Sequence, residues 1–143
     1  MAGEPATEQL SLEEIERDFW GSAPPGATRL IATVHELRQR PIAALGPEDL
    51  RILLGQRVGL ALLVPRALDR LEVDPLVEGD FYPGDLLVAV LGVPDSYWRD
   101  HPEQLARART VAGSVDLSEV DGQLRSDLER FSPGGAAGVA PTA

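Results

Sequence analysis

The chain has 143 residues, 43% hydrophobic and 25% charged, which is typical of a single globular domain and excludes wholesale disorder. Its formal net charge is −10 and its arginines are scattered among carboxylates. Nucleic acid is therefore not an expected partner, because a polyanion requires a concentrated basic face. The absence of cysteine excludes disulfides, zinc–thiolate sites and thiol catalysis.

The first predicted helix follows a loose leader at residues 1–10. Ser11 is a good N-cap, and Glu14 three residues later completes a capping box. Apolar residues then recur at helical spacing as far as Phe19. The cluster of glycine and proline within residues 21–26 ends this helix and forms a loop.

Two further helices are predicted before residue 56. One begins at Thr28 and stops at Pro41, because proline lacks the N–H that a helix requires. The next starts at Pro47, a residue favoured at the first helical position, and Gly55 is its expected C-terminal cap. The inward-facing residues of this third helix are expected to be Leu50, Leu53 and Leu54.

Two dense apolar runs lie in the middle of the chain, within residues 56–71 and 86–91. Short apolar runs can form either helices or buried strands, and periodicity alone does not distinguish them. Their leucine and alanine content and the neighbouring prolines favour helices. Pro65 falls inside the first run and is expected to kink or break that helix.

The last third of the chain is also predicted to be helical. A short turn carries Tyr97 and Trp98, and another helix begins at Pro102. A final amphipathic helix is predicted over residues 117–131. The uncharged tail at residues 132–143 consists mainly of glycine, alanine and proline and is expected to be disordered.

This order of elements predicts an all-α fold within residues 11–131. We expect a compact single-domain helical bundle of about six to seven short helices, joined by loops that prolines mark. No run approaches the ~18 apolar residues of a membrane span. The start of the chain also lacks the features of a signal peptide, so a cytoplasmic location is expected.

Five carboxylates fall within fourteen residues with no basic residue among them. Like charges placed so close together repel one another. Three interpretations remain open: helix capping, a divalent metal site, and a docking surface for a basic partner in which Phe81 and Tyr82 add apolar contact area. The spacing does not match a calcium-binding loop, so no metal or cofactor is predicted. The cluster consists of Glu72, Asp74, Glu78, Asp80 and Asp85.

Residues suited to catalysis are sparse. His35 and His101 do not stand near a serine in any pattern such as a nucleophile elbow, and a capping or half-buried position is favoured for both. No phosphate-binding loop and no H-E-x-x-H metal motif is present. The chain is therefore predicted not to be an enzyme.

Several sequence strings, taken together in this order, resemble the family of contact-dependent growth inhibition immunity proteins. The resemblance covers residues 12 to 98, and the run EGDFYPGDLL makes it specific. The part of the chain after Trp98 matches no string of that family, and the segment from Ala112 to Phe131 is expected to be peculiar to this protein. The matching strings are LEEIERDFW (Leu12–Trp20), HELR-x-x-P (His35–Pro41), LGPEDLRILLGQRVGL (Leu45–Leu60), DPLVEGDFYPGDLLVAVL (Asp74–Leu91) and the pair Tyr97-Trp98.

The resemblance implies a cytoplasmic immunity protein, monomeric when free, that binds the C-terminal domain of its cognate toxin and blocks it stoichiometrically. Many such toxins are nucleases with basic substrate-binding surfaces, which an acidic inhibitor would complement. Two alternatives are a non-catalytic acidic adaptor or regulatory protein and a small metal-dependent hydrolase. The predicted partner-binding residues are Glu78, Asp80, Tyr82 and Asp85, with Glu72 and Asp74 as outlying charge.

Overall fold

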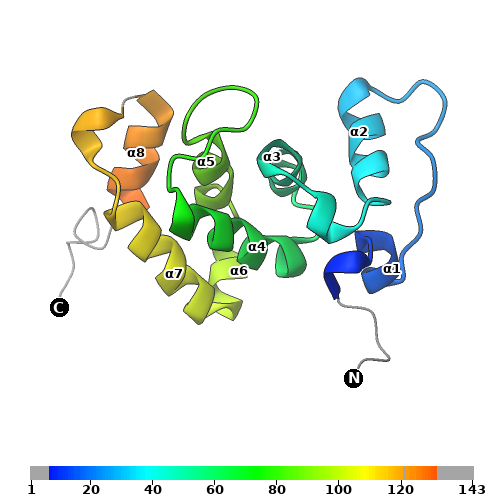
Figure 1. Cartoon of the computed structure of the whole chain (residues 1–143), viewed down its shortest axis with the longest axis horizontal. Coiled ribbons are helices and arrows are strands. Elements are labelled where there is room, and N and C mark those ends of the chain that lie inside the picture. The colour runs from blue at the N-terminus through cyan, green and yellow to red at the C-terminus, as the bar shows by residue number, and fades with distance from the viewer. Residues whose placement is uncertain (1–6, 121, 132–143) are drawn as a thin grey trace.

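The computed structural model describes residues 7–120 and 122–131, and these contain eight α-helices, three short 3-10 helices and no named β-strand (Figure 1). The predicted all-α class is thus confirmed. Most of the expected leader and the whole expected tail, residues 132–143, lie outside the described residues. The α-helices are α1 (Leu12–Glu16), α2 (Arg29–Leu37), α3 (Pro47–Gly55), α4 (Leu60–Val73), α5 (Asp85–Leu91), α6 (Asp95–Asp100), α7 (Pro102–Gly113) and α8 (Gly122–Phe131); the 3-10 helices are η1 (Thr7–Gln9), η2 (Ile42–Ala44) and η3 (Leu117–Glu119).

Helices α3, α4 and α5 pack on one another at the centre of the molecule. The N-terminal helix α2 packs on α3 at one end, and α7 and α8 pack on α4 and α5 at the other. Figure 1 shows this progression from the blue N-terminal helices to the orange C-terminal helix. None of the described helices is long and apolar enough to cross a membrane.

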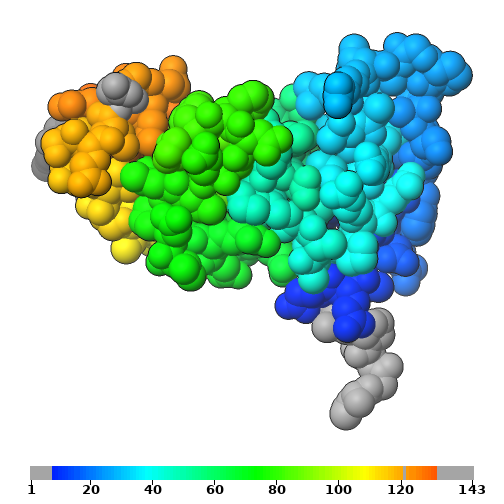
Figure 2. Space-filling view, turned by 45° about the horizontal axis from the view of Figure 1, so that its top comes forward, coloured from blue at the N-terminus to red at the C-terminus, as the bar shows by residue number. Residues whose placement is uncertain are grey.

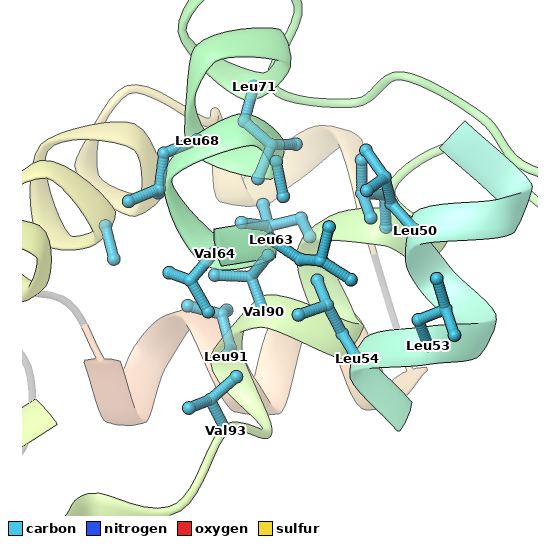
Figure 3. Packing of buried hydrophobic residues seen from close by; sticks show 14 of the residues in the cluster. Leu50, Leu53, Leu54, Leu63, Val64, Leu68, Leu71, Val90, Leu91 and Val93 are labelled. Carbon is cyan, nitrogen blue, oxygen red and sulfur yellow. The ribbon is translucent and has the colours of Figure 1, made fainter. Parts of the chain in front are cut away.

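The core lies where the three central helices meet, as Figure 3 shows. Leu63, Leu68 and Leu71 of α4 are each 0% exposed. Burial of one such side chain contributes about 1.5–3 kcal/mol relative to leaving it in water. Both apolar runs of the sequence are therefore helices, and the strand alternative is wrong. The residues labelled in Figure 3 are Leu50, Leu53 and Leu54 of α3, Leu63, Val64, Leu68 and Leu71 of α4, Val90 and Leu91 of α5, and Val93.

Helix α1 has the predicted capping box but ends earlier than predicted. The Glu14 N–H donates to Ser11 Oγ at 3.2 Å, and the Ser11 N–H donates to Glu14 Oε1 at 2.8 Å. The helix stops at Glu16 because Arg17 adopts a left-handed conformation, with φ of 55°. Phe19 therefore lies outside the helix and is 66% exposed, whereas the sequence pattern had placed it on the inward face.

Helices α2 and α3 begin where the sequence predicts. Thr28 Oγ1 accepts a hydrogen bond from the backbone of the first turn of α2, and Pro47 is the first residue of α3. The predicted cap at Gly55 is wrong by one residue, because Gly55 is still helical and Gln56 is the C-cap. The predicted inward stripe of α3 is confirmed, and its residues are Leu50, Leu53 and Leu54.

Helix α4 does not break at Pro65, and Pro65 is the sixth residue of this continuous 14-residue helix. A proline here removes one intrahelical hydrogen bond near the helix start. The helix is retained because its inward face is completely buried on both sides of the proline, at Leu63, Val64 and Ala67. Core packing thus outweighs the local cost.

The predicted helix over residues 117–131 is two elements, η3 and α8. Asp116 caps η3 by accepting the Ser118 N–H at 3.0 Å. Gly122 has a φ of +64°, which lies outside the α-helical region, so one continuous helix cannot pass through this residue and α8 begins at it. This division is important for the surface described below, because the end of η3 and the start of α8 line a hollow together with Leu76, Tyr82 and Pro83.

Candidate partner-binding site

The segment that joins α4 to α5, residues 74–84, is called the acidic loop here. It closes on itself through a hydrogen bond from Gly84 N to Leu76 O at 3.1 Å and an isolated antiparallel bridge between Glu78 and Pro83. Asp74 begins the loop by accepting the Leu76 N–H at 3.2 Å. The loop arches above α5 in Figure 1 and is therefore an ordered projection on the surface.

Asp85 holds the acidic loop from below. Its side chain is buried, and its two carboxylate oxygens accept hydrogen bonds from Gly79 N at 2.6 Å, Phe81 N at 3.0 Å and Tyr82 N at 3.4 Å. A carboxylate is well suited to this role because it only accepts, and each of its oxygens can serve more than one donor. The charge of Asp85, which the sequence placed among the partner-binding residues, is thus engaged by backbone N–H groups inside the protein, and Asp85 supports the loop from within.

A second anchor comes from α3 and was not found by sequence reasoning. Glu48 accepts the Asp80 N–H at 2.9 Å and an Arg51 Nε–H at 2.7 Å. The Arg51 guanidinium lies 4.4 Å from the centroid of the Phe81 ring, and its Nε is 3.9 Å from Asp85 Oδ2. The spacing of Glu48 and Arg51 was a visible signal for a helix-surface pair, but nothing local indicated that this pair reaches the loop.

The hydrogen bond from Arg51, followed by that from the Asp80 backbone, lowers the pKa of Glu48 below its ordinary value of 4.5. The same pairing raises the pKa of Arg51, chiefly through the hydrogen bond to Glu48. Both side chains therefore stay charged throughout the physiological range of pH. The anchor from α3 is an ionic one.

At two glycines of the loop a side chain would displace its neighbours. A Cβ at Gly79 would lie 2.6 Å from Glu48 Oε1 and 3.1 Å from both carboxylate oxygens of Asp85. Gly84 has a φ of +93°, and a Cβ there would lie 2.4 Å from Leu124 Cδ2. The glycines and Asp85 of the run EGDFYPGDLL are thus scaffold, and its remaining polar and aromatic residues face outward.

The outward-facing side chains of the acidic loop combine charge with apolar area. Glu78 and Asp80 are exposed, as are Phe81 (66%) and Tyr82 (42%). Within residues 7–120 and 122–131, no basic side chain lies within ion-pairing distance of Glu78, Asp80 or Asp74. In Figure 2 the green part of the chain forms the surface between the cyan and orange parts.

The predicted cluster is therefore only partly a single surface. Glu78, Asp80 and Tyr82 are together on the loop, and the exposed Asp74 is at its start. Glu72 is engaged elsewhere: it accepts the Arg107 Nε–H at 2.7 Å, and this bond lowers the pKa of Glu72. Its charge ties α4 to α7.

Residues 14–108 of the chain match the family of CDI immunity proteins, where CDI stands for contact-dependent growth inhibition. This range is well over half of the 143 residues. The chain belongs to the CDI immunity protein family. Its function is accordingly that of an immunity protein, which neutralises a toxin. A comparison with curated proteins finds none that matches the chain.

The matched range of the immunity protein contains the whole acidic loop together with its anchors Glu48, Arg51 and Asp85. It ends inside α7, so η3 and α8 lie beyond it. The glycines and the buried carboxylate that shape the loop thus lie in the part of the chain that matches the family model.

The immunity protein exposes aromatic residues in one more place, the N-terminal turn at residues 17–21. Trp20 is 43% exposed, whereas the other tryptophan, Trp98, is buried. The Trp20 N–H donates to Glu13 Oε2 at 3.0 Å. The guanidinium of Arg38, itself only 1% exposed, lies 4.2 Å from the centroid of a Trp20 ring and is 2.8 Å from Glu16.

Both histidines of the immunity protein have structural partners. His35 Nδ1 lies 3.0 Å from Gly21 O, and His101 Nδ1 lies 2.9 Å from Tyr97 O. Both side chains are half-buried, as the sequence favoured. Over the described part of the chain, no group of three or more His, Asp or Glu residues is placed to hold a metal ion.

Proposed function

We propose that this immunity protein binds the C-terminal domain of its cognate CDI toxin through the acidic loop and blocks that domain stoichiometrically, in the cytoplasm of the cell that makes both. The observation that carries the proposal is the pairing of exposed carboxylates, which have no ion-pair partner among the described residues, with exposed aromatic rings on an anchored backbone. Glu78 and Asp80 supply the charge, and Phe81 and Tyr82 supply the rings.

The anchoring supports a binding role because an ordered loop loses little conformational freedom when a partner docks. Asp85 and Glu48 together accept four backbone N–H groups of the loop. A partner therefore meets side chains that are already in place. This arrangement requires no catalytic group, since inhibition follows from occupancy alone.

The charge of the loop defines the partner's chemistry. The exposed carboxylates of the loop, which form no ion pair within residues 7–120 and 122–131, lower the potential around it and attract a cationic surface. A toxin of the nuclease type has such a surface, because it must hold a polyanionic substrate. We propose a basic toxin domain of this type, with tyrosine and phenylalanine contacting apolar surface between its basic residues.

The direct test reverses the loop charge and measures protection. Glu78→Arg/Asp80→Arg is compared with the matched control Asp100→Arg/Glu103→Arg, which changes the same charge at exposed positions of α6 and α7, away from the loop in Figure 1. The partner is the toxin domain encoded beside the immunity gene. Cells that express this toxin are expected to lose protection with the loop variant and to keep it with the control.

The same variants are then titrated with the purified toxin domain. Affinity is expected to fall by about a hundredfold or more for the loop variant, because like charges now face each other across the interface. Equal binding and equal protection by the loop variant and the wild type would show that the acidic loop is not the toxin-binding surface.

A further inference from the structure

A hollow of about 450 Å³ opens between the acidic loop and the C-terminal segment. Tyr82 contributes to one wall of it, so the hollow is continuous with the outward-facing surface of the loop. The opposite wall comes from the end of η3 and the start of α8. The lining residues are Leu76, Tyr82 and Pro83 on the loop side, and Glu119, Val120, Gly122, Gln123 and Leu124 on the other.

The two walls are fixed to each other. Leu124 is 4% exposed, and its Cδ2 lies only 2.4 Å from the position that a Cβ at Gly84 would take. Leu76 Cδ2 lies at 3.2 Å from the same position, so Gly84 is enclosed by one leucine from each wall. Helix α8 also packs on α5, directly below the loop. The hollow is therefore a fixed feature of the fold.

The lining of the hollow combines an apolar interior with an acidic edge. Leu76, Pro83 and Val120 offer carbon surface, and Glu119 is exposed with no basic side chain within ion-pairing distance among the described residues. The Gln123 Nε2–H donates to Asp127 Oδ1 at 2.9 Å, so this donor is already used within α8 and does not require a partner in the hollow. Such a site suits an aliphatic or aromatic side chain that lies next to basic residues.

The two walls also differ in their relation to the family. The loop wall lies inside the matched range, residues 14–108, and the wall from η3 and α8 lies outside it. A partner that fills the hollow touches both. The loop wall thus belongs to the part of the chain that matches the family model, and the second wall lies beyond that part.

We infer that this hollow seats an apolar side chain of the same toxin domain that docks on the acidic loop, and that Val120 and Gln123 give this protein its preference for one toxin. The inference rests on the proposed function, because the occupant belongs to the proposed partner. The loop attracts a basic toxin surface at long range, and the hollow holds one of its side chains at short range.

The test fills the hollow without changing charge. Gln123→Trp places a large ring at its mouth, and Ser126→Trp is the control, with the same ring at an exposed position of α8 that does not line the hollow. Rapid-mixing kinetics with the cognate toxin domain give association and dissociation rates separately. For Gln123→Trp we expect dissociation to accelerate by about tenfold or more, with association at low salt within about twofold of the wild type. Ser126→Trp should change neither rate.

A second variant, Val120→Ala, removes apolar wall instead of filling space and should accelerate dissociation by about threefold or more. A non-cognate CDI toxin domain measured in parallel should be insensitive to Gln123→Trp, so that the preference for the cognate toxin falls. Unchanged dissociation from the cognate toxin in both variants would overturn the inference and leave the acidic loop intact as the binding surface. Failure of the wild type to bind the toxin would instead overturn the proposed function.

The same samples identify a different occupant. If the free protein self-associates at high concentration and Gln123→Trp, but not Ser126→Trp, abolishes this, the hollow seats a second copy of the chain and the inference is wrong. A single monomeric species for all variants supports it.

Discussion

The acidic loop and the N-terminal turn both present aromatic side chains on a backbone that a buried carboxylate holds. In the loop, Asp85 accepts backbone N–H groups beneath Phe81 and Tyr82. In the turn, Glu13 accepts the Trp20 and Gly21 N–H groups at 3.0 and 3.1 Å. The same device thus creates two exposed aromatic surfaces at different places on one domain.

The two regions differ in what their remaining charges do. Beside the turn, Glu16 of α1 pairs with Arg38, and within the turn Asp18 accepts the Trp20 Nε1–H at 3.1 Å. In the loop, Glu78 and Asp80 have no basic partner among the described residues. A charge that is neutralised internally stabilises the fold, whereas an uncompensated exposed charge is available to a partner. Stability and toxin binding should therefore respond to different substitutions.

The largest effect is expected for Arg38→Met, which removes the guanidinium that contacts the N-terminal turn. This substitution leaves Glu16 and the carbonyl of Asp18 without their donor. The side chain of Arg38 is 1% exposed and that of Glu16 is 32% exposed, so we expect the loss of this half-buried pair to cost about 2–3 kcal/mol of unfolding free energy. Urea denaturation measures the loss, and the folded variant should associate with toxin at the wild-type rate. A loss below about 1 kcal/mol would show that the charges of the turn are not structural.

Gly84→Ala tests the frame of the acidic loop. Alanine at this position must adopt a φ of +93°, which is strained for a residue with a Cβ, and the added Cβ collides with Leu124 Cδ2. We therefore expect the unfolding free energy to fall by about 2 kcal/mol. Gly113→Ala is the matched control, because a Cβ at Gly113 meets nothing within 4 Å. Denaturation curves that coincide for the two variants would contradict the close packing of α8 against the loop.

The ion pair between Glu48 and Arg51 is tested by pH. Because the pKa of Glu48 is lowered in the folded protein, its contribution to stability is present above 4.5 and is lost as pH falls through the folded value. Glu48→Gln should therefore be less stable than the wild type at neutral pH, and the difference should shrink below pH 4.5. A difference independent of pH would mean that Glu48 acts through its shape and not its charge.

The smallest effect on stability is expected for Glu78→Gln/Asp80→Asn in the acidic loop. Both side chains are exposed and form no ion pair with any residue that the structure describes, so the unfolding free energy should change by no more than about 0.5 kcal/mol. Any change should be stabilising, because the substitution removes repulsion between carboxylates. A clear loss of unfolding free energy would show that Glu78 and Asp80, like Arg38, stabilise the fold.

The helices could be predicted from the sequence because their signals are local. The capping box of Ser11 and Glu14, the first-turn position of Pro47 and the buried leucines of α3 all depend on residues within one or two turns of each other. The early end of α1 could not be predicted in this way. The turn that follows α1 is held by hydrogen bonds from Arg38 to Glu16 and to the carbonyl of Asp18, and Arg38 is more than twenty residues away from Glu16.

The position of the candidate site along the chain was predictable from the sequence, but the role of each of its residues was not. Composition identified the acidic run, yet it gave no means of separating the exposed Asp80 from the buried Asp85. That separation depends on the loop folding back over α5, and the second anchor, Glu48, lies 32 residues before Asp80. The hollow beside Tyr82 needs α8, which the sequence joined to η3 in a single helix.

The central claim is that the uncompensated carboxylates of the acidic loop attract the toxin. The most direct measurement is the association rate with the cognate toxin domain as a function of salt concentration, for the wild type and Glu78→Gln/Asp80→Asn. The wild-type rate should fall steeply with added salt, and the variant should be slower by about tenfold at low salt, with the two rates converging at high salt. Two curves that coincide at every salt concentration would contradict the claim.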